Sequence, residues 1–339
     1  MHVAQRCAAV LGNDMHKCTG MGMDRGQQTV VPVMRVALKT YAALMLAQIA
    51  LWSNPAHADW RDDIGTFRIG IVAEPGAGNA VPGLAVLTDA YTKALGMKVE
   101  FVVARDYAAL IEAQANSRIE YAIYSATAYA TASQRCLCIE PLVAPVDSDG
   151  SIGIRSVLLT RDGKLPDLAA MDSHRIAMAP SDSVGGSLLP LAALAAEGRK
   201  IAEDAPFLVR ADSAATAETM LVDGSADGLF GWVTAAADGP REPSGTQARL
   251  EAAGLSVTAL RVVWTSGLLR YGPHAVRSDL DPEAKRRLTV FLTNLKSTTP
   301  DIYDLLESKH PGGFATVAPK DYEMAAAIVR FVSDRGQQQ

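Results

Sequence analysis

The chain contains few of the residues that build metal centres. Its 339 residues include four cysteines and six histidines. After residue 58 the histidines are His174, His274 and His310, and their wide separation matches no zinc-ligand spacing. The sequence also lacks the G-x-S-x-G elbow of hydrolases and the Lys that a phosphate-binding P-loop requires after its glycines. We therefore expect no metal, no cofactor and no catalytic residue.

Cysteine is also scarce after residue 58, where only Cys136 and Cys138 occur. Their spacing leaves three interpretations open: packing at a helix end, a bridge between the two sulfurs, or a site for a soft metal. We infer no function from them.

The chain has no excess of positive charge. Lys and Arg number 32 against 37 Asp and Glu, so the formal net charge is -5 at pH 7. Residues 59–339 are more acidic still, with 27 basic against 35 acidic side chains. This balance argues against nucleic acid or an anionic membrane as a partner. No segment after residue 58 reaches the roughly 18 uninterrupted apolar residues of a membrane span.

The beginning of the chain reads as an export signal. Arg35 and Lys39 form a basic region, Tyr41–Trp52 is an apolar region, and Ala56–Ala58 is a small-residue cleavage signal. The pattern predicts that translation starts at Met34 and that residues 1–58 are removed near Ala58. The expected location of the mature chain is the periplasm.

Residues 59–339 exceed the size of one compact core, which favours two lobes. Short apolar strands alternate with helices of 3.6-residue periodicity, and this alternation predicts an α/β fold with mostly parallel sheets covered by helices. The predicted strands are 67–72, 99–103, 119–124, 157–160, 175–179, 207–209, 229–233 and 256–263. The predicted helices are 82–95, 107–115, 127–134, the segment after residue 186, 214–222, 283–295, 302–306 and 322–332. Residues 238–245 read as a polar loop.

We expect lobe 1 to comprise residues 59–157 and 265–339, and lobe 2 to comprise residues 158–264. A ligand cleft is expected between the lobes, where strand ends meet helix starts.

The most informative segment is the strand, turn and helix over residues 177–198. Ser183, Gly185 and Gly186 occupy the turn, and Pro190 suits the first turn of the helix that follows. Backbone N–H groups at such a turn point outward at the positive end of the helix, which favours an anion. An ordinary helix N-cap is the alternative.

The pattern over Tyr107–Ala130 resembles the periplasmic phosphate, phosphite and phosphonate binding proteins of ABC importers. The resemblance continues through Ser156–Arg161 and Arg175–Pro190, and more weakly through Asp223–Trp232 and Trp264–Leu280. It implies a type II periplasmic binding protein fold in which two lobes close on the ligand by a hinge movement.

The resemblance also implies where the ligand binds. The family's Ser-Thr-Ser-Gly turn corresponds to Ser183, Val184, Gly185 and Gly186, so two hydroxyls are missing here. Each lost hydrogen bond to a charged oxygen forfeits about 1.5 to 3 kcal/mol. Trp232 stands where the family often has an acid. These departures predict a ligand with more apolar or aromatic surface that still carries one anionic group.

Further ligand contacts are expected at other strand ends. Ser125 and Thr127 begin a helix after a strand, and Tyr129 matches a Tyr of the family; capping and core packing are the alternatives. Glu74 and Asn79 lie in a Gly- and Pro-rich loop, which serves either recognition or simple connection.

The sequence thus predicts a monomeric, exported solute-binding protein that takes a small anionic ligand to an ABC permease in the inner membrane. Two alternatives remain open: a periplasmic ligand sensor for a membrane kinase, and a periplasmic enzyme on the same fold.

Overall fold

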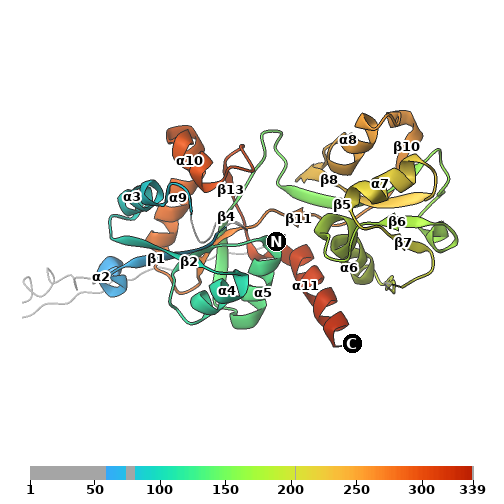
Figure 1. Cartoon of the computed structure of the whole chain (residues 1–339). Coiled ribbons are helices and arrows are strands. Elements are labelled where there is room, and N and C mark those ends of the chain that lie inside the picture. Colours follow the sequence, from blue (N-terminus) through green and yellow to red (C-terminus); the bar gives the residue numbers. More distant parts are fainter. Residues whose placement is uncertain (1–58, 74–80, 203, 338–339) are drawn as a thin grey trace, which may run out of the picture. The chain divides into compact units, whose positions relative to one another are not determined.

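The computed structural model describes residues 59–73, 81–202 and 204–337 (Figure 1). All of them belong to one compact unit, Ala58–Gln339. The predicted export signal lies outside the described residues, and so do the predicted ligand contacts Glu74 and Asn79.

The first sheet has six strands in the order β13-β4-β12-β3-β1-β2. These strands are β1 (Phe67–Val72), β2 (Val99–Ala104), β3 (Tyr121–Ile123), β4 (Ile139–Pro145), β12 (His274–Arg277) and β13 (Phe314–Thr316). β1 pairs in parallel with β2 and β3, whereas β12 and β13 form antiparallel pairs. Two stretches of chain that are far apart in sequence therefore build one sheet.

The second sheet has seven strands, and its main path runs β10-β5-β8-β6-β7. Its strands are β5 (Gly153–Arg161), β6 (Ile176–Met178), β7 (Leu208–Arg210), β8 (Gly228–Ala236), β9 (Gly239–Pro240), β10 (Leu260–Thr265) and β11 (Leu269–Arg270). β6 pairs in parallel with β7 and β8. The long strand β5 runs antiparallel to β8, β10 and β11.

Both sheets are mixed, which corrects the expectation of mostly parallel sheets. Parallel pairs occur where a helix crosses over between two strands, as between β1 and β2. Antiparallel pairs occur at β5 and β12, the strands that follow the two passages of the chain from one sheet to the other. The expected α/β class, with two sheets flanked by helices, is confirmed.

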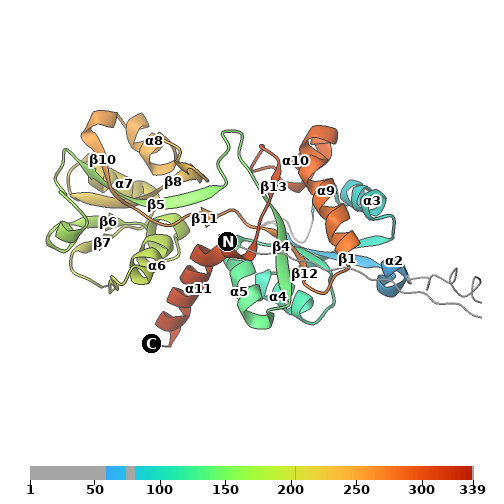
Figure 2. The same cartoon turned by 180° about the vertical axis from the view of Figure 1, so that it is seen from behind.

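Helices cover both faces of each sheet (Figures 1 and 2). On the first sheet, α3 (Leu84–Leu95), α9 (Pro282–Thr298) and α10 (Pro300–Leu306) pack into one apolar cluster, and α4 (Tyr107–Ala115) and α5 (Ala126–Cys136) into another. On the second sheet, α7 (Ala214–Val222) and α8 (Gly245–Ala252) cover one face, and α6 (Leu189–Ala196) covers the other. The short helix α2 (Trp60–Ile64) precedes β1.

The last helix, α11 (Glu323–Gly336), packs against both α5 and α6. Leu189 and Ala192 of α6 share one apolar cluster with Tyr129 of α5 and Ala325 of α11. The C-terminal helix thus joins helices that flank different sheets.

Most predicted elements form close to their predicted positions, with one exception. The predicted strand over 256–263 is wrong in its first half, because Val257–Ala259 form a 3-10 turn whose N-cap is Ser256. Seven of the observed α-helices and strands were not predicted from the sequence: α2, α8, β4, β9, β11, β12 and β13. Helix α8 gives little signal because its sequence GTQARLEA has too few apolar residues to show a period. None of the described helices is long and apolar enough to cross a membrane.

Candidate functional site

The turn between β6 and α6 is a five-residue π-helical segment, Val184–Leu188. The amides of Ser187 and Leu188 both donate to the carbonyl of Ser183. Within the described part of the chain, no acceptor meets the amides of Val184, Gly185 or Gly186. Gly185 and Gly186 are buried, while Val184 is 40% exposed. The turn therefore presents three unpaired N–H groups, which we call the cradle.

Glycine is required at both buried positions of the cradle by close contacts. A Cβ atom at Gly185 would lie 2.7 Å from Cδ1 and 2.8 Å from Cγ of Trp232. A Cβ atom at Gly186 would lie 2.8 Å from Cβ of Ala179 and 3.4 Å from Oγ of Ser183. The glycines in this turn therefore serve packing as well as close approach of a ligand.

Trp232 is held in place from several sides. Its backbone N–H donates to Oγ1 of Thr246 at 3.1 Å. The Arg249 guanidinium lies over the indole, 5.2 Å from the ring centroid, and donates to Glu218 and to Thr246. A Cβ atom at Gly245 would meet Cε3 of the indole at 2.7 Å. The indole N–H has no acceptor among the described residues, and its nitrogen is not buried.

Arg210, which sequence reasoning missed, lies beside the cradle. It ends β7, opposite Met178 at the end of β6. Its Nη1 donates to Oγ of Ser187 at 3.0 Å and to the carbonyl of Ala179 at 3.1 Å. Carboxyl ends of neighbouring parallel strands meet at one sheet edge, and this rule would have indicated Arg210 from the sequence.

The residues predicted at the start of α5 have structural roles of their own. Oγ of Ser125 accepts from the amide of Ala128 at 3.2 Å, so Ser125 caps the helix. Thr127 is partly exposed in the first turn. Tyr129 is 2% exposed and its ring packs on Tyr322 at 4.8 Å, a core position that favours packing over ligand contact. Burial raises the pKa of the Tyr129 hydroxyl to about 12.

Cys136 and Cys138 form a disulfide at the end of α5. Of the three interpretations that the sequence left open for this pair, the structure shows the bridge between the two sulfurs. Leu137, between the two cysteines, is 83% exposed. No group of three or more His, Cys, Asp or Glu side chains in the described residues could hold a metal ion.

The two passages between the sheets are tied together by polar contacts. Asp147, after β4, accepts from the hydroxyl of Tyr271, after β11, and contacts Nδ1 of His310 at 3.0 Å. The rings of Tyr271 and His310 are stacked, with centroids 3.8 Å apart. Burial and the neighbouring Asp147 carboxylate raise the pKa of the Tyr271 hydroxyl, so it stays a donor at neutral pH.

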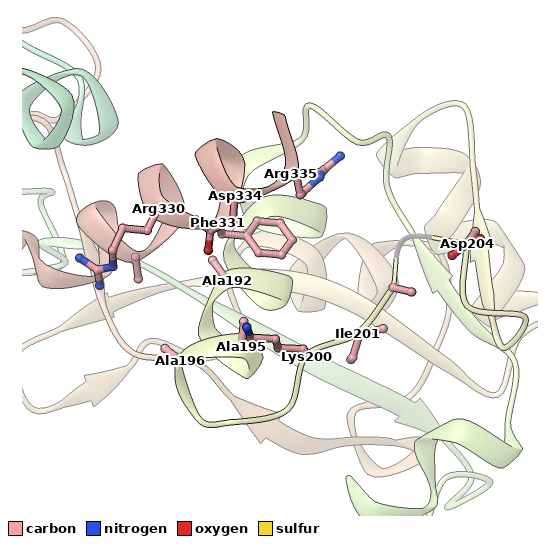
Figure 3. Close-up of a pocket in the computed structure, with 12 residues that line it drawn as sticks. Ala192, Ala195, Ala196, Lys200, Ile201, Asp204, Arg330, Phe331, Asp334 and Arg335 are labelled. Carbon is pink, nitrogen blue, oxygen red and sulfur yellow. The ribbon is translucent and has the colours of Figure 1, made fainter. Parts of the chain in front are cut away.

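A cavity of about 650 Å³ lies between α6 and α11 (Figure 3). Ala192 and Ala195 of α6 face Phe331 of α11 across it, and Lys200 and Arg330 stand among its lining residues. None of the ligand contacts predicted from the sequence lines this cavity. It is therefore separate from the cradle.

The sequence was compared with families of known proteins. Residues 69–322 match the family described as ABC transporter, phosphonate, periplasmic substrate-binding protein. No protein of curated function matches the sequence.

Solved structures share the fold at low sequence identity. XAC2383 from Xanthomonas citri, bound to ATP, is 16% identical with a TM-score of 0.52, covering 80% of this chain and 98% of that chain. Transferrin 1 from Manduca sexta is 12% identical with a TM-score of 0.56, covering 80% of this chain and 46% of that chain. PhnD1 from Prochlorococcus marinus, in complex with methylphosphonate, is 14% identical with a TM-score of 0.45, covering 79% of this chain and 98% of that chain.

The match over residues 69–322 covers most of the sequence and confirms the resemblance seen in the sequence alone. The chain belongs to the family of periplasmic substrate-binding proteins of phosphonate ABC transporters.

Proposed function

We propose that this protein is exported, binds a small organic anion at the cradle, and delivers it to an ABC permease in the inner membrane. The single observation that carries the proposal is the set of three unpaired amides at Val184, Gly185 and Gly186. Buried N–H groups without an acceptor are costly, and an anionic group at the positive end of the π turn and α6 would satisfy them.

The surroundings of the cradle favour an anion that also has an apolar part. The exposed side chain of Val184 and the indole of Trp232 border the amides where the family has hydroxyls and an acid. The indole N–H is a donor and cannot accept from a ligand amine. The proposed ligand is therefore an organic anion without a cationic group, such as an aryl or alkyl phosphonate.

The proposed mechanism is closure of two lobes on the ligand. The chain passes twice between the sheets, once between β4 and β5 and once between β11 and β12, and these passages form the proposed hinge. The expected lobe bounds, 59–157 with 265–339 and 158–264, differ from these passages because residues 153–157 and 269–270 belong to strands of the second sheet. Ser125 and Thr127, at the start of α5, are the proposed contacts from the first lobe. The closed monomer would then be the form that the permease recognises.

Thermal unfolding and calorimetric titration of the purified protein test the proposal. The probes are phosphate, methylphosphonate, phenylphosphonate, 2-aminoethylphosphonate and ATP, because a ligand that binds only the folded state raises its unfolding midpoint. We expect phenylphosphonate to bind more tightly than 2-aminoethylphosphonate. Tighter binding of 2-aminoethylphosphonate would contradict the proposed ligand class. If no anion raised the unfolding midpoint or gave a binding signal in calorimetry, the cradle would not be a binding site.

A further inference from the structure

Two arginines occupy neighbouring positions on the strands that connect the sheets. Arg270 of β11 pairs directly with Gly153 of β5 in an antiparallel register, and Arg155 follows two residues later on β5. Directly opposed residues share a face of the sheet, as do residues two apart on one strand. Arg155 and Arg270 therefore project from the same face, in the diagonal relation that brings Cα atoms within about 7 to 8 Å.

Within residues 59–73, 81–202 and 204–337, neither arginine has an acidic partner. Nε of Arg155 and Nε of Arg270 are both buried, and no hydrogen-bond partner among these residues meets them. Arg155 donates through Nη1 to the carbonyl of Ser266 at 2.8 Å. No carboxylate of the described residues pairs with either guanidinium, whereas many surface arginines, such as Arg277 with Asp279, do have an acidic partner.

The face that carries the two arginines is distinct from the one that carries α6. Ile154 and Leu269, a directly opposed pair on the other face of β5 and β11, belong to the apolar cluster that contains Leu188 and Leu189. Val157, two residues beyond Arg155, belongs instead to the cluster of α7 and α8. The arginine pair therefore lies across the strands from the cradle.

Two partly buried positive charges without a counter-charge are unfavourable in the empty protein. Their planar, permanently charged guanidinium groups are suited to oxyanions, to which they can donate in pairs. We propose that Arg155 and Arg270 form a second anion site, separate from the cradle, that binds a doubly charged tetrahedral oxyanion such as sulfate or the phosphate dianion. A dianion balances both cations, whereas a monoanion of the same shape leaves one uncompensated.

Sulfate and methanesulfonate test the site, because they have the same tetrahedral head and differ in charge. Each is titrated calorimetrically into the full chain at constant ionic strength. We expect sulfate to bind with one-to-one stoichiometry and methanesulfonate to bind at least tenfold more weakly. Arg270→Gln and Arg155→Gln should each weaken sulfate binding about tenfold or more, the usual effect of losing a hydrogen bond between charged groups.

Arg261→Gln is the matched control. Arg261 lies in the same sheet and donates to the carbonyls of Leu165 and Pro166, so its removal changes the net charge equally at another place. We expect this variant to bind sulfate like the original protein. Arg270→Gln without anion should unfold at the same or a higher temperature, because an unpaired cation has been removed.

Three results would overturn the proposal: no saturable sulfate binding by the original protein, equal loss in Arg261→Gln, or a lower unfolding midpoint of anion-free Arg270→Gln. The site is also independent of the cradle. Val184→Asp, which places a carboxylate at the cradle, should leave sulfate affinity within about twofold while it weakens binding of the organic anion at least tenfold. Loss of both ligands in that variant would contradict two separate sites.

Discussion

The indole of Trp232 lies directly against the backbone of Gly185. A Cβ atom at position 185 would come within 2.7 Å of Cδ1 and 3.0 Å of Cβ of Trp232. The glycine in the cradle and the tryptophan in the middle of β8 are therefore one packing unit, although they are distant in the sequence. A side chain at position 185 is incompatible with the observed position of the indole at position 232.

Gly185→Ala tests this contact. The added methyl group must displace the indole, and we expect a loss of about 1 to 3 kcal/mol in the free energy of unfolding, as for overpacked sites in general. Chemical denaturation measures it. Gly336→Ala is the control, because a Cβ atom there meets nothing within 4 Å and should cause no loss. A double variant in which Trp232→Val accompanies Gly185→Ala should recover part of the stability; equal stability of Gly185→Ala and the original protein would refute the packing unit.

Val184→Asp tests the cradle as the anion site. Val184 is exposed, so the substitution places a carboxylate beside the unpaired amides without disturbing the core. Like-charge repulsion, together with competition for the amides, should weaken phenylphosphonate binding at least tenfold in calorimetry. Val184→Asn has nearly the same shape and no charge, and should bind within a few fold of the original protein. Equal affinity of both variants would place the anion elsewhere.

The buried side chain of His274 makes the free energy of unfolding depend on pH. It is buried in the first sheet, where the hydroxyl of Tyr121 contacts its Nδ1, and burial lowers its pKa to about 3. In the unfolded chain the imidazole takes up a proton near pH 6.5. Between these two values the unfolded state binds more protons, so stability falls as the pH falls. By pH 4 the loss is on the order of 3 kcal/mol relative to pH 7.

Denaturation at several pH values, compared with the same series for His274→Asn, isolates this contribution. The variant keeps a side-chain oxygen that can accept from Tyr121 and removes the titrating ring. Its stability should therefore change less between pH 7 and pH 4, whatever its absolute value. Parallel pH profiles of the two proteins would show that His274 does not carry the effect.

The disulfide between Cys136 and Cys138 closes a very short loop. Loop-closure entropy for so few residues is worth only about 1 to 2 kcal/mol. Replacing both cysteines by serine should therefore lower the free energy of unfolding by no more than this amount and leave phenylphosphonate affinity unchanged. A larger loss, or any change in affinity, would mean that the bridge also holds a part of the binding site.

The sequence alone predicts the bounds of a helix or strand correctly where a local pattern decides them. β1, α4 and α7 form at their predicted bounds, because strand alternation, helical periodicity and capping residues such as Asp106 and Ser213 act over neighbouring residues. The turn with Ser183, Gly185 and Gly186 follows from local residue types for the same reason, and its role as a ligand contact stays a prediction. Helix α8 escaped prediction because packing on β8, rather than an apolar period of its own, stabilises it.

Tertiary structure decided everything that depends on distant partners. For Tyr129 the sequence leaves ligand contact and core packing open, and the tertiary structure adds its burial and its contact with Tyr322 from the last part of the chain. No local pattern in the sequence relates Arg270 to Arg155, and only the register of β11 with β5 places the two arginines on neighbouring positions.

The sequence by itself therefore determined the α/β class, the order of the alternating strands and helices from β1 to α5, and the turn before α6 that we call the cradle. The tertiary structure decided that both sheets are mixed, that the indole of Trp232 packs against Gly185, and that Arg155 and Arg270 have no acidic partner among the described residues. Pairing between strands and close packing depend on contacts between residues far apart in the chain, and no local periodicity records which distant residues will meet.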